Sequence, residues 1–132
     1  MSVTEKKKQE LYLELKSLDE EIKTLNMHLE NIDAQLAELN SSKDIVNKIS
    51  ELKKGEEIRM PITSGIYVKA KLDDTSKLMV NVGGNVTVEK TPKEVTKILD
   101  SQLLELAKYR ENIVDQMKVF IIRIEEIQKE VE

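Results

Sequence analysis

Every glycine and proline of this chain lies in one central stretch, residues 55–92. Glycine and proline are the residues that most often interrupt a helix, so the segments on either side contain no strong helix breaker. The sequence therefore predicts a single domain with a helix over residues 1–54, two β-hairpins over 55–90 and a second helix over 91–132. The six residues concerned are Gly55, Gly65, Gly83, Gly84, Pro61 and Pro92.

Within the central stretch the apolar residues change from helical spacing to alternation with polar residues, the pattern of strands that bury one face. Four short strands fit this pattern. The sequences Thr63-Ser64-Gly65 and Gly83-Gly84-Asn85 are typical of turns within hairpins, and Asp73-Asp74-Thr75-Ser76 separates the two hairpins by local backbone bonding. The apolar residues of the strands, which we expect to carry oligomerisation, are Ile58, Met60, Ile62, Ile66, Val68, Ala70, Leu72, Leu78, Val80, Val82, Val86 and Val88.

Both flanking segments carry apolar residues at alternating steps of four and three, beginning at Leu11 in the first and at Leu99 in the second. A stripe this narrow packs against a partner helix rather than against the side of a globule. Because the hairpins join the helices at one end, an antiparallel coiled coil is the simplest arrangement. Arg110 is the polar interruption of the second stripe, either to fix the register or because its charge reaches past the core to water.

Helix boundary signals agree with this division. Lys53 and Lys54 precede Gly55, which predicts the end of the first helix at that glycine. Thr91-Pro92-Lys93-Glu94 predicts the start of the second, with Thr91 as the N-cap and Glu94 completing a capping box.

The strands predict that this chain assembles with other subunits. An isolated hairpin is marginally stable in water, and no other layer in this chain is available to cover the apolar strand faces. The fold predicted is therefore α+β, a long antiparallel two-helix coiled coil whose two hairpins assemble with those of other subunits into a closed β-barrel or a stacked sheet.

Apolar residues also spread beyond the stripe near the free helix ends. They either thicken the two-helix interface, meet a neighbouring arm, or grip the apolar surface of other proteins. On the last reading we expect these tips to bind clients through Leu11, Tyr12, Leu13, Phe120, Ile121, Ile122 and Ile124.

Composition and motifs indicate no enzyme. The chain has 132 residues, 3% aromatic, no cysteine and a formal net charge of −4, which argues against a large globular core and against nucleic acid as the main partner. His28 is the single histidine, so no common zinc site can form around it. We expect no catalytic residues, metal or cofactor, no membrane association, and a cytoplasmic location.

Three segments, residues 61–72, 77–83 and 88–91, resemble the hairpin region of alpha-class prefoldin subunits, above all the archaeal ones. The resemblance implies an ATP-independent holdase subunit. Two alpha subunits and four beta-class subunits would form a hexamer that holds unfolded proteins at its coiled-coil tips and delivers them to a group II chaperonin. One departure is Gly83-Gly84-Asn85, where the family commonly has Gly-x-Gly, although asparagine tolerates the left-handed backbone region.

Two other functions remain open. The same hairpins could build a structural scaffold or filament without clients. A coiled-coil arm of an enzyme such as a tRNA synthetase would need a basic rod, whereas the end of the second helix carries four glutamates, Glu125, Glu126, Glu130 and Glu132.

Overall fold

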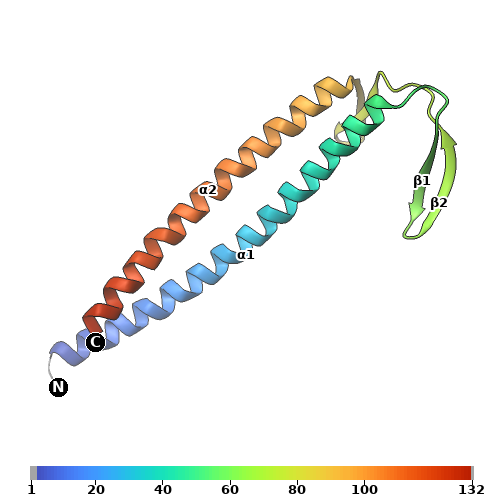
Figure 1. The fold of residues 1–132 in the computed structure, drawn as a ribbon. Coiled ribbons are helices and arrows are strands. Elements are labelled where there is room, and N and C mark those ends of the chain that lie inside the picture. Colours follow the sequence, from blue (N-terminus) through green and yellow to red (C-terminus); the bar gives the residue numbers. More distant parts are fainter. Residues whose placement is uncertain (1–2, 132) are drawn as a thin grey trace. The chain divides into compact units, whose positions relative to one another are not determined.

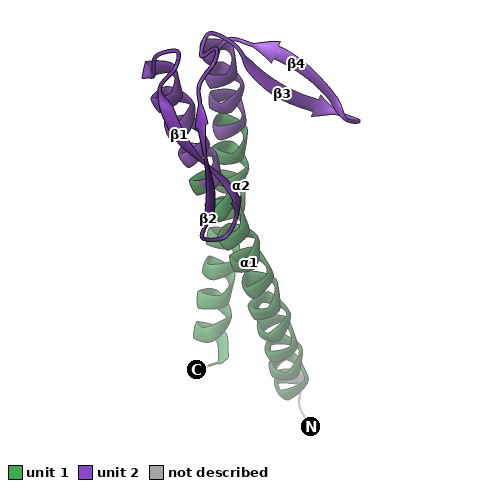
Figure 2. Ribbon diagram, turned by 90° about the vertical axis from the view of Figure 1, so that its right-hand side faces the viewer, with its two compact units in different colours: residues 1–37, 104–132 green, residues 38–103 purple. Residues whose placement is uncertain are grey.

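The computed structural model describes residues 3–131. Along the chain, two long helices flank two antiparallel hairpins, as expected from the sequence (Figure 1). The chain divides into unit 1, residues 1–37 and 104–132, and unit 2, residues 38–103 (Figure 2). The elements are α1 (Val3–Glu51), β1 (Glu57–Thr63), β2 (Ile66–Lys71), β3 (Leu78–Gly83), β4 (Val86–Lys90) and α2 (Pro92–Val131).

Helix α1 ends at Glu51, earlier than the sequence predicts. The amide of Leu52 donates to the carbonyl of Ile49 at 3.1 Å, which tightens the last turn. Gly55 belongs instead to a separate turn, with φ of +88°, and its amide donates to the carbonyl of Leu72 at 2.7 Å. The glycine therefore serves the junction between the helix and the first hairpin, a long-range contact that the local sequence pattern does not reveal.

The strand register separates an apolar from a charged face in the first hairpin. Ile58 lies opposite Ala70 and Met60 opposite Val68. Directly paired residues project from the same face of a sheet, so these four side chains share one face. The other face includes Lys69, whose Nζ lies 3.8 Å from a carboxylate oxygen of Glu57.

The second hairpin is closed by a turn that needs left-handed backbone. Gly84 and Asn85 connect β3 to β4 with φ of +58° and +61°. Positive φ at both central residues is the geometry that matches the twist of a two-residue hairpin. The side chain of Asn81 accepts a hydrogen bond from the amide of Gly83 at 2.9 Å. Asn85 thus adopts the left-handed backbone in the position where a second glycine is common in the family that the sequence resembles.

Between the hairpins, Asp74 Oδ1 accepts hydrogen bonds from the amide and the hydroxyl of Ser76, at 2.8 and 2.6 Å. These bonds hold the pKa of Asp74 below its ordinary value. The local backbone bonding expected for this turn is confirmed.

Helix α2 begins with the predicted cap. The hydroxyl of Thr91 accepts a hydrogen bond from the amide of Glu94 at 3.1 Å and lies 3.2 Å from the Glu94 carboxylate. The Val95 amide donates to the Thr91 carbonyl at 3.0 Å. The Thr91 hydroxyl thus satisfies one of the amides that a helix start leaves free, and the bond from Val95 is the first one inside the helix.

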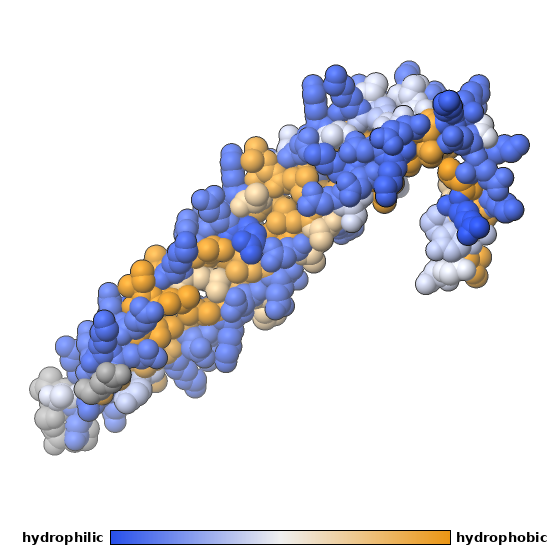
Figure 3. All heavy atoms as spheres, in the orientation of Figure 1, coloured by the Kyte–Doolittle hydropathy of each residue, from blue (hydrophilic) through white to orange (hydrophobic). Residues whose placement is uncertain are grey.

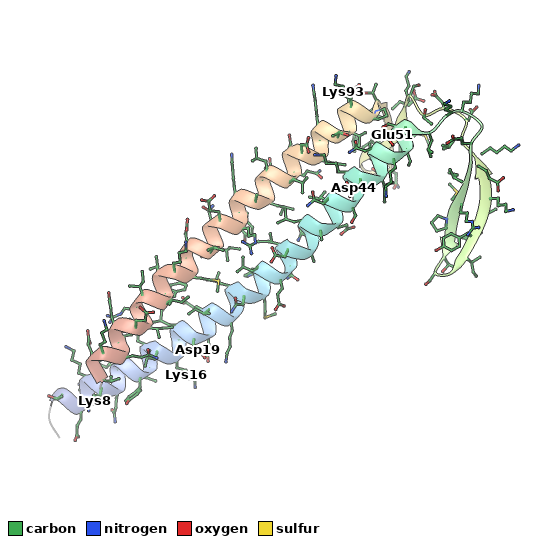
Figure 4. All side chains as sticks on the ribbon, in the orientation of Figure 1. Lys8, Lys16, Asp19, Asp44, Glu51 and Lys93 are labelled. Atoms are coloured by element: carbon green, nitrogen blue, oxygen red, sulfur yellow. The ribbon has the colours of Figure 1, made fainter. Side chains whose placement is uncertain are left out.

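In unit 1 the first part of α1 and the last part of α2 run antiparallel, with their apolar stripes turned toward each other. Ile32 and Ile113 are 3% exposed, and Ile127 is fully buried. Apolar residues gather between the helices (Figure 3). The labelled side chains of Lys16 and Asp19 lie on the side of α1 turned away from α2 (Figure 4).

Arg110, the polar residue in the stripe of α2, bonds the partner helix. Its Nε donates to Asp33 Oδ1 at 2.7 Å, with the side chain 43% exposed. The carboxylate raises the pKa of the guanidinium. The guanidinium of Arg110 therefore lies at the edge of the apolar stripe, where the carboxylate of Asp33 pairs with it.

In unit 2 the helices are bridged by Lys43 and Asp100, whose charged atoms lie 2.6 Å apart. The two hairpins form two separate two-stranded sheets. Over residues 3–131, neither α1 nor α2 contains an apolar run that could span a bilayer.

Candidate functional site

Two surfaces of the chain expose apolar side chains that a water-soluble monomer would normally cover. One lies at the open end of unit 1, where the start of α1 and the end of α2 lie side by side (Figure 1). We call this end the tip. The other surface is formed by the hairpins of unit 2.

The structure divides the seven expected tip residues into two groups. Leu11 is 8% exposed, and Phe120 and Ile124 are half-buried, because all three belong to the heptad stripe that packs α1 against α2. The remaining four lie outside the stripe and are exposed by 56%, 69%, 43% and 56%: Tyr12, Leu13, Ile121 and Ile122. Of the seven expected residues, only these four offer substantial apolar surface to solvent.

The sequence analysis missed Val119, which is 63% exposed. It lies one turn before Arg123 on the same face of α2. Its position outside the heptad stripe, next to Phe120, was the signal that could have identified it.

The tip also contains an ion pair that the sequence analysis did not identify. Arg123 donates from Nε to Glu14 Oε1 at 2.8 Å and from Nη2 to Glu14 Oε2 at 3.1 Å. Its Nη1 donates to Glu126 at 3.3 Å. We call the two-point bond between Glu14 and Arg123 the clasp. A planar guanidinium matches both oxygens of a carboxylate, so this geometry is more specific than a single contact.

The clasp shifts the titration of both partners. Hydrogen bonding from Arg123 is the main cause that holds the pKa of the Glu14 carboxyl below its ordinary value. Desolvation opposes this shift, and the positive charge of Arg123 adds to it as the smallest of the three effects. The same bond, with that to Glu126, raises the pKa of the guanidinium. Both side chains are more than a third exposed, so the pair is partly screened by solvent.

The tip contains a shallow groove beside the clasp. It is lined by polar side chains over two apolar residues of the stripe, namely Ser17, Glu20, Glu21, Thr24, Gln116, Leu25 and Phe120. A groove of this kind has no deep apolar pocket for a small molecule.

The hairpins form the second surface. Of the twelve residues expected to carry oligomerisation, half are exposed by 44% to 67%: Met60, Ile62, Ile66, Val68, Val82 and Val86. The other half are partly buried, namely Ile58, Ala70, Leu72, Leu78, Val80 and Val88. Each two-stranded sheet thus presents an apolar face that its own hairpin leaves uncovered.

No group of three or more metal-binding side chains occurs among residues 3–131. His28 is exposed on α1. The described part of the chain exposes apolar surfaces and forms ion pairs between its helices.

Comparison with known proteins identifies a family. A family model described as prefoldin subunit matches residues 18–132. Prefoldin subunit alpha of Thermofilum pendens is 31% identical over 96 residues, which are 73% of this chain and 74% of that protein. Prefoldin subunit alpha of Methanopyrus kandleri is 31% identical over 112 residues, covering 80% of this chain and 71% of that protein.

Two further matches are more distant in sequence. Prefoldin subunit 5 of Homo sapiens is 26% identical over 113 residues, covering 86% of this chain and 73% of that protein. A cryo-EM structure of filamentous PFD from Methanocaldococcus jannaschii matches with a TM-score of 0.80 and 22% identity, covering 90% of this chain and 98% of that one. At that identity the likeness concerns the fold.

Proposed function

Because this chain belongs to the prefoldin family and is of the archaeal alpha type, we propose that it is a subunit of an ATP-independent holdase that captures unfolded polypeptides at its tips. Prefoldins are chaperones without enzymatic activity, and their subunits form hetero-oligomeric complexes. The observation that carries the proposal is the exposure of four apolar residues at the tip of unit 1, Tyr12, Leu13, Ile121 and Ile122.

The partners proposed for assembly are beta-class prefoldin subunits, in a hexamer of two alpha and four beta chains. The uncovered apolar faces of the two hairpins support this proposal, since strands with one bare apolar face need a second layer. Closure into an intersubunit barrel would also remove the exposed strand edges. In this arrangement residues 55–90 form the platform, while residues 1–54 and 91–132 form the arm.

Client binding in such a complex is multivalent. Each tip exposes a small apolar area and binds weakly, but several tips on one platform raise the effective concentration for one client. The client is held reversibly without nucleotide and can then pass to a group II chaperonin. The proposed location is the cytoplasm. A chain without cysteine forms no disulfides and is compatible with this reducing compartment.

The test compares two variants with equal composition changes. The tip variant replaces Tyr12, Leu13, Ile121 and Ile122 by serine. The control variant replaces one tyrosine, one leucine and two isoleucines outside the tip group, which are exposed by 36% to 58%: Tyr109, Leu104, Ile45 and Ile98. Each variant is assembled with beta-class subunits, and the aggregation of a chemically unfolded test protein is followed by light scattering without ATP.

We expect the control assembly to suppress aggregation as the wild type does, and the tip variant to lose most of this effect while keeping the mass of the complex. Equal suppression by both variants would contradict the assignment of the tip. A wild-type complex that assembles but suppresses nothing would contradict the holdase function itself.

A scaffold or filament subunit is the second candidate, favoured by the filamentous structure with which this fold matches. On this alternative the hairpins drive continuous growth and the arms bind no client. Electron microscopy of the purified chain separates the two functions, because long filaments favour the scaffold and compact particles with arms favour the holdase.

A further inference from the structure

Two exposed apolar residues at the tip each lie two positions before a residue of the clasp. Tyr12 precedes Glu14 by two positions, and Ile121 precedes Arg123 by two positions. Two residues correspond to a rotation of about 200° around a helix. Each apolar side chain therefore lies on nearly the opposite side of its helix from the clasp residue that follows it.

The clasp shows which side of α1 and which side of α2 lie on the same flank of the helix pair. Glu14 and Arg123 contact each other, so both lie on one flank of the interface between α1 and α2. It follows that Tyr12 and Ile121 lie together on the other flank. We call the two sides the clasp flank and the open flank.

The two flanks differ in the bonds between the helices, although the clasp flank also carries the exposed Val119. On the clasp flank, Glu126 adds a third bond to Arg123 at 3.3 Å. One heptad inward from the clasp, Glu21 and Gln116 line the polar groove. The open flank instead carries Tyr12 and Ile121, exposed by 56% and 43%.

The remaining exposed apolar residues do not extend the open flank. Leu13 and Ile122 are one position further along, about 100° around their helices, on the outer backs of α1 and α2. These backs point away from each other in a helix pair. Val119 belongs to the clasp flank, because it lies one turn before Arg123.

We infer that the tip binds its client on one side only, through the open flank, and that the clasp is a positioning element that closes the other side. This inference rests on the proposed holdase function. Tyr12 and Ile121 together expose on the order of 200 Å², whereas a stable interface needs about 800 Å² from each partner. The open flank therefore fits a short apolar segment of an unfolded chain, held transiently, better than it fits a second arm.

The chain contains no cysteine, so one introduced cysteine can carry a cross-linker at a single known position. We would attach the same photoactivatable reagent to Ile121→Cys and to Val119→Cys, which differ by two positions and lie on opposite flanks. Tyr12→Cys and Leu13→Cys provide a second pair on α1. Each variant is assembled with beta-class subunits, mixed with a chemically unfolded test protein and illuminated.

We expect the yield of cross-links to the test protein to be about fivefold or more higher from position 121 than from 119, and from 12 than from 13. A ratio of this size corresponds to the free energy of one buried apolar contact, which only the open flank provides. Equal yields within each pair would overturn the one-sided tip. So would cross-links that join two arms and exclude the test protein. If the wild-type complex fails to suppress aggregation, the holdase function falls, and this inference falls with it.

The positioning role of the clasp has a separate readout. In Arg123→Gln the clasp is lost, so we expect the ratio of yields between positions 121 and 119 to move toward one, a change that a general loss of stability would not produce. Glu126→Gln keeps both bonds between Arg123 and Glu14 and should keep the ratio. An unchanged ratio in Arg123→Gln would overturn the positioning role.

Discussion

Charged side chains of α1 form hydrogen bonds with charged side chains of α2. The Glu14 carboxylate accepts two hydrogen bonds from Arg123, which lies 109 positions away in the sequence. Arg110 makes a comparable bond to Asp33. Each bond satisfies a charge at the edge of the apolar stripe, so the helices can pack there without burying an unpaired charge.

The clasp makes stability depend on pH. Because the pKa of Glu14 is lower in the folded protein than its ordinary value of 4.5, the clasp adds to the free energy of unfolding above that value. The contribution is lost as the pH falls through the lowered pKa of the folded state. We therefore expect the wild type to lose stability more steeply than Glu14→Gln as the pH falls below 4.5, measured by denaturant unfolding with circular dichroism.

Asp74 also has a lowered pKa, but it is present in both proteins and cancels in the comparison. At neutral pH, Glu14→Gln should be the less stable protein, and added salt should narrow the difference because the pair is partly exposed. Parallel pH curves for the two proteins would refute the role of the clasp in stability.

At the scale of elements, α2 depends on a cap that local sequence determines. The hydroxyl of Thr91 accepts the Glu94 amide, whereas the hydroxyl of Thr24, in the interior of α1, donates to the carbonyl of Glu20 at 3.1 Å. The first bond satisfies an amide that the helix leaves free, and the second duplicates an acceptor that the helix already uses.

Thr91→Ala and Thr24→Ala therefore remove the same atoms with different results. We expect Thr91→Ala to lower the free energy of unfolding by about 1 kcal/mol. Thr24→Ala should leave it unchanged or raise it slightly, because alanine has the higher helix propensity. Denaturant midpoints of the two assembled variants provide the measurement, and an equal loss in both would show that the cap contributes nothing of its own.

At the scale of the whole molecule, the fold leaves its hairpins incomplete. Val68 and Tyr67 are adjacent in β2 and are exposed by 44% and 59%, but they project from opposite faces, Val68 beside Met60 and Tyr67 beside Pro61. Only the face with Val68 is continuously apolar. The proposed platform would bury that face and leave the other in water.

Aspartate at these two positions tests the platform. We expect Val68→Asp to prevent assembly with beta-class subunits, since an unpaired charge cannot be buried in an apolar layer. Tyr67→Asp should assemble with the wild-type mass, as determined by size-exclusion chromatography with light scattering. A complex of normal mass from Val68→Asp would rule out this face as the interface, and a monomeric wild type at micromolar concentration would rule out obligate assembly.

Much of the local structure could be predicted from the sequence. The confinement of glycine and proline to residues 55–92 separates helices from strands, and the change from heptad spacing to alternation identifies which is which. The cap at Thr91 and the left-handed turn at Asn85 are also local, because each is decided by residues within a few positions. These features depend on backbone preferences that neighbouring residues determine without the rest of the fold.

The candidate site was predictable only in part. From the sequence, both Leu11 and Tyr12 are expected to bind clients. Packing against α2 buries Leu11 and leaves Tyr12 exposed. The end of α1 at Glu51 and the pairing of Glu14 with Arg123 depend on contacts with distant residues. Sequence alone thus determined the elements and their apolar stripes. Which side chains remain exposed, and on which flank, was decided only when the two helices packed, because burial and ion pairing are properties of both partners at once.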